Sequence, residues 1–276
     1  MRIVILILAA ALDLQAQVIS GSVRDRQSGE LLPYATIGIK GKSIGVIADR
    51  NAKFQLDLQG AVAKDSLVIR YLGYQQLSFC LRDLKDGVTL NVRLVADNKM
   101  LREVVVYDRK QLTALGNDEK SFYHTGWGFN ESERGRTRGL RVERPEFPLF
   151  LVSFHMHLHE NTFDSVRFRL HLLHATEAFE PLVNENIFLT ISKKRGWIEF
   201  DLKPYQIVVS EPFVLAVEWV DAWGRVKGPE EESHIITISE GRGSGQKFYR
   251  EKPEEPVTLQ PGKRITSLYV KGYAAR

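Results

Sequence analysis

Apolar and polar residues alternate through most of residues 18–94, and this pattern restricts the region to β-strands with one buried face. Residues two apart on a strand point to the same side of a sheet. The apolar positions that share a face are Ala35, Ile37 and Ile39; Phe54, Leu56 and Leu58; Leu67, Ile69 and Tyr71; and Leu90, Val92 and Leu94. The positions between them are mostly polar, as at Lys53, Gln55 and Asp57. The region therefore predicts a β-sandwich whose outer faces meet water.

Short motifs within this region also resemble a known family. They are Ile19-Ser20-Gly21-Ser22-Val23, Leu32-Pro33-Tyr34-Ala35-Thr36-Ile37, Asp49 before Phe54, and Tyr71-Leu72-Gly73-Tyr74. On these residues, 17–95 resemble the carboxypeptidase regulatory-like domain, a prealbumin-like β-sandwich found at the N-terminus of TonB-dependent receptors and in other exported bacterial proteins. The resemblance implies a fold more than an activity, because one fold hosts many unrelated sites. The family usually has glycine where this chain has Ala52, so we expect Asn51 to adopt the left-handed conformation in that turn.

The first residues have the organisation of a signal peptide. Arg2 is followed by an apolar run from Ile3 to Leu12 and by the small-residue cleavage signal Leu14-Gln15-Ala16. The run is too short to cross a bilayer, which needs about 20 apolar residues. We expect removal of 1–16, export to the periplasm or cell surface, and no stable membrane insertion after cleavage. Cys80 is the single cysteine, so a disulfide would have to join two chains.

The rest of the chain predicts a connector at 96–117 and a second domain at 118–276. Within the connector, Leu101 to Val106 is similar to the segment that leads toward the plug in TonB-dependent receptors. Long helical periodicity is absent, and we expect at most a turn or two of helix near Lys110 to Leu115. The residues that follow are too few for a plug and a large barrel, so we expect no transporter. Strands are predicted at Phe150 to Leu158, Val166 to Leu172, Ile187 to Ile191, Trp197 to Leu202, Phe213 to Val220, His234 to Ile238 and Ile265 to Val270. Their number and spacing favour a jelly-roll-like β-sandwich and an all-β chain. Pieces around Trp197 and Trp219 are similar to C-terminal domains attached to regulatory-like domains in other exported proteins.

Alternating histidines provide the clearest candidate for chemistry. His155, His157 and His159 share one face of a predicted strand, a spacing that can bind zinc or copper. A hairpin at Glu160 to Asp164 would place Arg167 and Arg169 beside them, and fixed positive charge disfavours a divalent cation.

Three interpretations of this face remain. It is a polar outer face whose arginines pair with Glu199 and Asp201, a site in which His155, His157, Arg167 and Arg169 bind an anionic group, or a metal site of His155, His157 and His159 in a metal-dependent hydrolase. The His-x-x-Glu zinc pair of carboxypeptidases does not fit, because residues three apart on a strand face opposite sides. We expect no cofactor.

Aromatic residues suggest a carbohydrate-binding module as a further alternative. Trp219 has the parity of a core residue, whereas Trp223 beside Gly224 is expected in an exposed loop, where it could stack on a sugar. Gly241 to Gly245 is expected to be a flexible hairpin loop.

Charge and motifs exclude several classes of function. The net charge is +4, and the arginines between Arg134 and Arg144 alternate with glutamates, which is typical of a solvated loop or edge strand. We expect no nucleic-acid partner and no enzyme. The sequence predicts a non-catalytic exported binding or assembly protein of the cell envelope, whose partner is an envelope protein or a glycan recognised by the second domain.

Overall fold

The computed structural model describes residues 18–84, 87–97, 107–127, 133–146, 148–224 and 235–275. The predicted signal peptide lies outside these residues. Over the described ranges the chain is all-β, with short 3-10 turns at η1 (Leu81–Asp83) and η3 (Lys203–Tyr205). No helix in this described part has the length and apolar character needed to cross a membrane.

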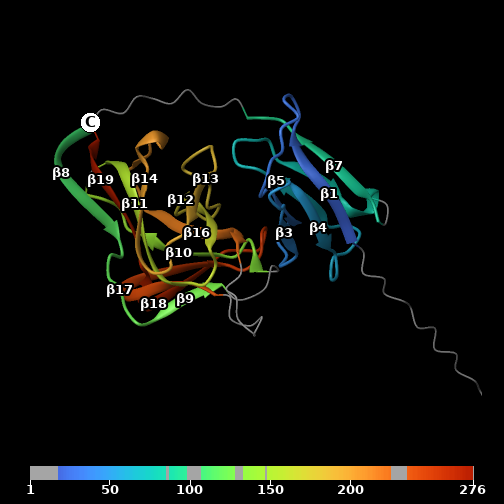
Figure 1. The fold of residues 1–276 in the computed structure, drawn as a ribbon. Coiled ribbons are helices and arrows are strands. Elements are labelled where there is room, and N and C mark those ends of the chain that lie inside the picture. Colours follow the sequence, from blue (N-terminus) through green and yellow to red (C-terminus); the bar gives the residue numbers. More distant parts are fainter. Residues whose placement is uncertain are drawn as a thin grey trace, which may run out of the picture.

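The first domain is a β-sandwich of two small sheets (Figure 1). One has the order β4-β1-β7 and the other β3-β2-β5-β6 among the described residues. The strands are β1 (Val18–Asp25), β2 (Thr36–Ile39), β3 (Gly45–Ile47), β4 (Lys53–Asp57), β5 (Ser66–Arg70), β6 (Leu77–Cys80) and β7 (Thr89–Leu94). The alternating apolar residues fill the space between the sheets, with Tyr71 and Leu90 partly buried at its margin. The period-two pattern of the sequence is thereby confirmed.

The turn before Phe54 differs from our expectation. Ala52, not Asn51, has the left-handed conformation, with a φ of 57°. The Asp49 carboxylate accepts hydrogen bonds from the backbone N–H groups of Asn51 and Lys53, both at 2.8 Å, and fixes the turn around Ala52. Ala52 is fully buried, so an asparagine side chain at that position would have to bury its amide without water. Ala52, a small apolar residue, adopts the left-handed conformation at this buried position instead.

The second domain has two layers that share one long strand. Its strands are β8 (Tyr107–Gly116), β9 (His124–Trp127), β10 (Thr137–Val142), β11 (Leu149–Asn161), β12 (Ser165–His174), β13 (Ile187–Ile191), β14 (Gly196–Asp201), β15 (Val208–Val209), β16 (Phe213–Trp223), β17 (Ile236–Arg250), β18 (Thr258–Thr266) and β19 (Leu268–Ala275). The beginning of β17 pairs with β11 and β9, and its later part pairs with β10 and β18. The apolar core lies between a layer containing β8, β19, β11 and β14 and a layer containing β13, β12, β16 and β10.

Two predicted irregular segments are strands. Lys110 to Leu115 belongs to β8, which pairs with β19, so this part of the expected connector is a strand of the second domain. Gly241 to Gly245 lies inside β17, with a register shift against β18 between Arg242 and Gly245. A side chain at Gly241 would meet the Glu119 carbonyl oxygen at 2.3 Å. The glycine there serves a close backbone approach rather than a flexible loop.

A buried carboxylate joins the two domains. Asp221 in β16 is fully buried and accepts a hydrogen bond from the Tyr34 hydroxyl of the first domain at 2.9 Å. Arg50, also from the first domain, approaches Asp221 at 2.9 Å, and Arg134 of the second domain approaches it at 3.5 Å. Burial raises the pKa of Tyr34, and the neighbouring Asp221 raises it further, so the hydroxyl remains a donor.

A turn of the second domain also packs against the β3-β2-β5-β6 sheet of the first domain. Pro253 lies so close to Gly45 that an added Cβ would meet its carbonyl oxygen at 2.5 Å. The neighbouring Glu254 pairs with Arg70 at 3.2 Å, and Glu255 accepts a hydrogen bond from Ser43 at 2.8 Å. Glycine on β3 thus allows contact that any side chain would prevent.

We predict that Asp221→Asn destabilises the whole chain. The substitution removes the negative charge that compensates Arg50 and Arg134, which should cost about 3 kcal/mol of unfolding free energy. Urea unfolding followed by tryptophan fluorescence measures this loss. The matched control is Asp201→Asn. Asp201 is 55% exposed, and its ion pair with Lys203 is long, at 3.7 Å. This substitution should therefore change the unfolding free energy by less than about 0.5 kcal/mol. Equal effects of the two substitutions would contradict the role of Asp221.

Candidate functional site

The predicted histidine and arginine cluster is divided between the two layers of the second domain. β11 pairs with β14, β15, β17 and β19, whereas β12 pairs with β13 and β16. The expected hairpin between these strands is therefore wrong, and His155 and His157 do not lie beside Arg167 and Arg169. The chain crosses from one layer to the other after Asn161, so that the apolar faces of both strands reach the common core.

Arg167, Arg169 and Trp223 lie at the contact between the domains. Trp223 ends β16, and the guanidinium groups of Arg50 and Arg167 lie over its ring at 4.8 and 5.0 Å. Arg169 donates a hydrogen bond to the Tyr34 carbonyl oxygen. The expected loop position of Trp223 is thus wrong, and this tryptophan stacks on arginines instead of offering an open platform to a sugar.

The acidic partner of Arg169 is also not the one expected. Glu218, only 2% exposed, lies 3.4 Å from Arg169 Nε and 2.8 Å from His171 Nε2. Burial alone would raise the pKa of Glu218, but Arg169 and the hydrogen bond from His171 lower it to about 2. Glu199 and Asp201 lie on β14, opposite His155 and Ser153 of β11. The proposed pairing of the β12 arginines with Glu199 and Asp201 is therefore wrong.

The basic cluster around β10 is not a solvated edge. Arg138 is 7% exposed and pairs with Glu251 at 2.7 Å, and Arg136 pairs with Glu133 at 2.7 Å. β10 lies between β16 and β17 within its sheet. The alternating charges of this segment are thus used in ion pairs of a central strand.

Four aromatic rings form a contiguous surface on the other layer, which we call the ring face: His155, His157, Trp197 and Tyr269. His155 of β11 stacks on Tyr269 of β19 at 4.3 Å, with the ring planes 1° apart. Trp197 of β14 meets Tyr269 edge-on at 5.2 Å and His157 at 5.0 Å. The rings therefore extend across β11 from one neighbouring strand to the other. His155 is buried beneath them, and the other three side chains are partly open to solvent.

One ring nitrogen of His155 and one of His157 already have hydrogen-bond partners. His155 Nε2 is 2.9 Å from Ser153 Oγ, and His157 Nδ1 is 2.8 Å from Ser239 Oγ. His159 instead stacks on His124 of β9 at 4.4 Å. Within the described ranges no group of three His, Cys, Asp or Glu side chains is arranged to hold a metal ion.

The three histidines of β11 have pKa values below the usual value of a histidine side chain. Burial lowers the pKa of His155, His157 and His159. Lys120 and Lys193 lower the pKa of His157 further, and His124 and Arg195 act in the same direction on His159. A neutral imidazole has one donor and one acceptor nitrogen, and a serine hydroxyl can pair with either.

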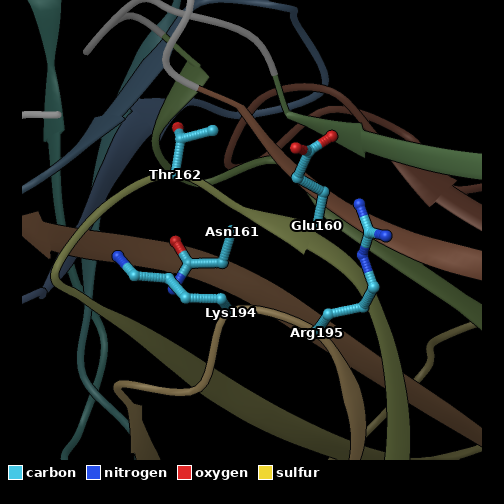
Figure 2. Close-up of a pocket in the computed structure, with 5 residues that line it drawn as sticks. All are labelled: Glu160, Asn161, Thr162, Lys194 and Arg195. Carbon is cyan, nitrogen blue, oxygen red and sulfur yellow. The ribbon is translucent and has the colours of Figure 1, made fainter.

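A pocket of about 260 Å³ adjoins the His159 end of β11. Glu160, Asn161, Thr162, Lys194 and Arg195 line it, as Figure 2 shows. Lys194 donates a hydrogen bond to the Phe163 carbonyl oxygen, and Asn161 donates one to the Lys193 carbonyl oxygen at 3.2 Å. The Thr162 hydroxyl is likewise bonded to the backbone of Ile235, so the polar groups that line the pocket are held in place by hydrogen bonds within the protein.

Trp197 and Tyr269 join the predicted histidines, and the sequence contained a signal for both. Trp197 shares parity with Glu199 and Asp201, and Tyr269 shares parity with Lys271. Charged residues at alternate positions mark the outer face of a strand, so the aromatic residue in the same series lies outside the core. Trp219, in contrast, is 3% exposed and packs in the core, as its parity predicted.

Residues 19–106 match the family model of the CarboxypepD_reg-like domain. The first domain is a CarboxypepD_reg-like domain. No curated protein is significantly similar to the chain. The family match covers about a third of the chain and relates the first domain alone to this family.

Similarity to solved structures is weak. The cysteine protease and lectin-like domains of Cwp84, a surface layer associated protein of Clostridium difficile, align at 5% identity with a TM-score of 0.34, covering 91% of this chain and 61% of that chain. The T13 particle of infectious bursal disease virus aligns at 12% identity with a TM-score of 0.27, covering 93% and 62%. The chain thus spans about three fifths of these solved chains, and values this low support no inference about function.

We predict that stability falls as the pH is lowered from 6.5 toward 5. A histidine whose pKa is lowered in the folded state binds its proton more readily when unfolded. Its contribution to stability is therefore complete above the unfolded pKa of 6.5 and is lost as the pH falls through the folded pKa. Urea unfolding at several pH values measures the slope. His155→Gln should reduce it, whereas His174→Gln, at an exposed position, serves as the control. An unchanged slope in His155→Gln would refute this linkage.

We also predict that the ring face holds no stoichiometric zinc or copper. His155 and His157 are hydrogen-bonded to serines, and Lys120 and Lys193 repel a cation from His157. Elemental analysis of purified residues 17–276, after removal of any tag, should find less than about 0.1 metal ion per chain. One ion per chain that is lost in His155→Ala and His157→Ala would restore the metal-site interpretation.

Proposed function

We propose that the protein is an exported, non-catalytic binding protein of the bacterial cell envelope that recognises a glycan on the ring face of its second domain. The observation that carries the proposal is the contact of Trp197, Tyr269 and His157 on the outside of a sheet. Export is supported by the signal-peptide pattern of residues 1–16 and by the regulatory-like domain, a type that occurs in exported proteins.

Aromatic side chains on an outer face are suited to sugars. The C–H faces of a pyranose ring are apolar and pack on aromatic rings, while its hydroxyls need polar partners at the rim. Partly exposed Trp197 and Tyr269 supply the rings. Glu199, opposite His155 on β14, and Lys271, whose Nζ lies 5.8 Å from the Tyr269 ring, supply charged groups at the edge.

The neighbouring pocket extends the polar surface. Asn161 and Thr162 line it together with Lys194 and Arg195. Amide, hydroxyl and guanidinium groups are donors that match sugar hydroxyls and carboxylates. A glycan longer than one sugar would cross from the ring face into this pocket along β11.

The contact between the domains gives the binding face a rigid support. In Figure 1, β8, β19 and β11 lie on the side of the second domain that faces away from the first. The ion pairs of Asp221 and Glu254 act on the opposite side. We infer that the regulatory-like domain orients the second domain and leaves the ring face open.

A metal-dependent hydrolase is the less supported alternative. Its proposed ligands have other contacts in the structure: His155 and His157 contact serines, and His159 stacks on His124. A face built of neutral imidazoles and aromatic rings favours binding of an uncharged or weakly charged ligand.

Glycan binding by the purified protein tests this proposal. A glycan array should identify a bacterial envelope glycan, and isothermal titration should show at least a tenfold loss of affinity, about 1.4 kcal/mol, in Trp197→Ala and Tyr269→Ala. Leu31→Ala, an exposed apolar position of the first domain, is the matched control and should bind normally. Absence of any bound glycan, or loss of binding in Trp223→Ala but not in Trp197→Ala, would overturn the assignment of this face.

A further inference from the structure

Two neighbouring aromatic side chains of the second domain are exposed to solvent. Phe122 is 90% exposed, and the adjacent Tyr123 is 56% exposed. Both lie in the segment before β9, which continues into His124, the ring that stacks on His159. At this position the phenylalanine does not contribute to the core. A partner that covers it would bury its apolar surface, which is favourable.

The backbone that carries Phe122 is fixed. Ser121 Oγ donates a hydrogen bond to the Glu240 carbonyl oxygen at 2.5 Å and accepts one from Tyr123 N–H at 3.1 Å. Glu240 N–H donates to the Tyr123 carbonyl oxygen at 2.7 Å, and His124 is paired with Ser239 in β17. The turn is therefore anchored on both sides of Phe122. An aromatic residue presented on an ordered backbone loses little entropy on binding, which is typical of the residues that dominate interface energies.

Two arginines lie beside this turn without an acidic partner. The Arg264 guanidinium is 3.5 Å from the centre of the Tyr123 ring. Arg242 of β17 is directly opposite Arg264 of β18 in the antiparallel pair, so both side chains share a face. Within the described residues neither forms an ion pair, and the nearby Glu240 is paired with Lys247 at 2.6 Å. Like charges opposite each other on neighbouring strands are unfavourable unless an anion compensates them.

We propose that Phe122 and Tyr123, together with Arg242 and Arg264, form a docking surface for an acidic, partly apolar segment of a partner protein. Phe122 enters an apolar pocket of the partner, and carboxylates of the partner pair with the two guanidinium groups. This surface is separate from the glycan-binding face proposed above and assigns a second, protein partner to the chain.

The composition of the surface favours a protein over a membrane. Anchoring on a lipid surface needs a broad apolar face or a long acyl chain combined with several basic residues. Phe122 is one side chain, and the acidic Asp118 and Glu119 precede it in the same exposed segment. One projecting phenylalanine does not provide the broad apolar face that a membrane anchor needs, whereas it can fill a pocket in a partner protein.

Selection from a displayed library of random twelve-residue peptides tests the proposal. The library is selected on residues 17–276 and counter-selected on the double variant Phe122→Ala, Arg264→Gln. Enriched peptides should combine Asp or Glu with an apolar residue, and they should bind at least tenfold more weakly to each single variant. Leu112→Ala and Lys263→Gln, at exposed positions of β8 and β18, are the matched apolar and basic controls and should bind normally. Thermal melting confirms that each variant is folded.

Several results would overturn the docking surface. They are the absence of enriched peptides, enrichment of neutral or basic peptides, and equal binding to the double variant. Vesicles of phosphatidylglycerol and phosphatidylethanolamine, and polygalacturonate, are tested in parallel, and a Phe122-dependent interaction with either instead of peptides would assign the surface to lipid or glycan. Trp197→Ala should leave peptide binding unchanged, so failure of the glycan proposal and failure of this one are distinguishable.

Discussion

The buried carboxylate of Asp221 is the interaction on which the arrangement of the two domains depends. A carboxylate removed from water is tolerated only when cations and hydrogen-bond donors surround it. Here the donors come from both domains, with Tyr34 and Arg50 on one side and Arg134 on the other. Because Tyr34 and Arg50 belong to the other domain, separation of the domains would remove two of the partners of this buried charge. This requirement explains why arginines and aromatic residues are concentrated at this contact.

The same contact determines which surfaces remain for function. The β3-β2-β5-β6 sheet of the regulatory-like domain is covered where Gly45 faces Pro253. Polar side chains of β12 and β16 form hydrogen bonds with Tyr34 and Arg50. The opposite layer of the second domain has no such task. Its outer side carries the rings of His155, His157, Trp197 and Tyr269, with Phe122 at the margin. The domain contact and the proposed binding face therefore lie on different layers of one sandwich.

The alternation of the sequence predicted the strands well, since it reflects burial of one face and needs no knowledge of neighbours. Ile187 to Ile191 agrees with β13 residue for residue. The pairing of the strands was harder to predict from the sequence, because it depends on contacts between residues that are distant in the chain. Glu160 to Asp164 has the polar composition of a hairpin, yet β11 and β12 lie in different layers, and that one error joined His155 to Arg169 in the expected site. The signal for β8 was similarly non-local, because Leu112 becomes part of a strand only through its pairing with Tyr273 of β19.

Two histidine environments show how pairing decides chemistry for the same residue type. His171 on β12 is held against Glu218, and although burial lowers its pKa, the carboxylate acts in the opposite direction. His157 on β11 meets Ser239 and Trp197, and its charged neighbours Lys120 and Lys193 are cationic. The first histidine belongs to a buried ion network that holds the protein together, and the second is a neutral ring on an open surface. Both residues lie on the polar face of a strand, and the layer in which each strand lies decides whether its histidine meets a carboxylate or a serine and an aromatic ring.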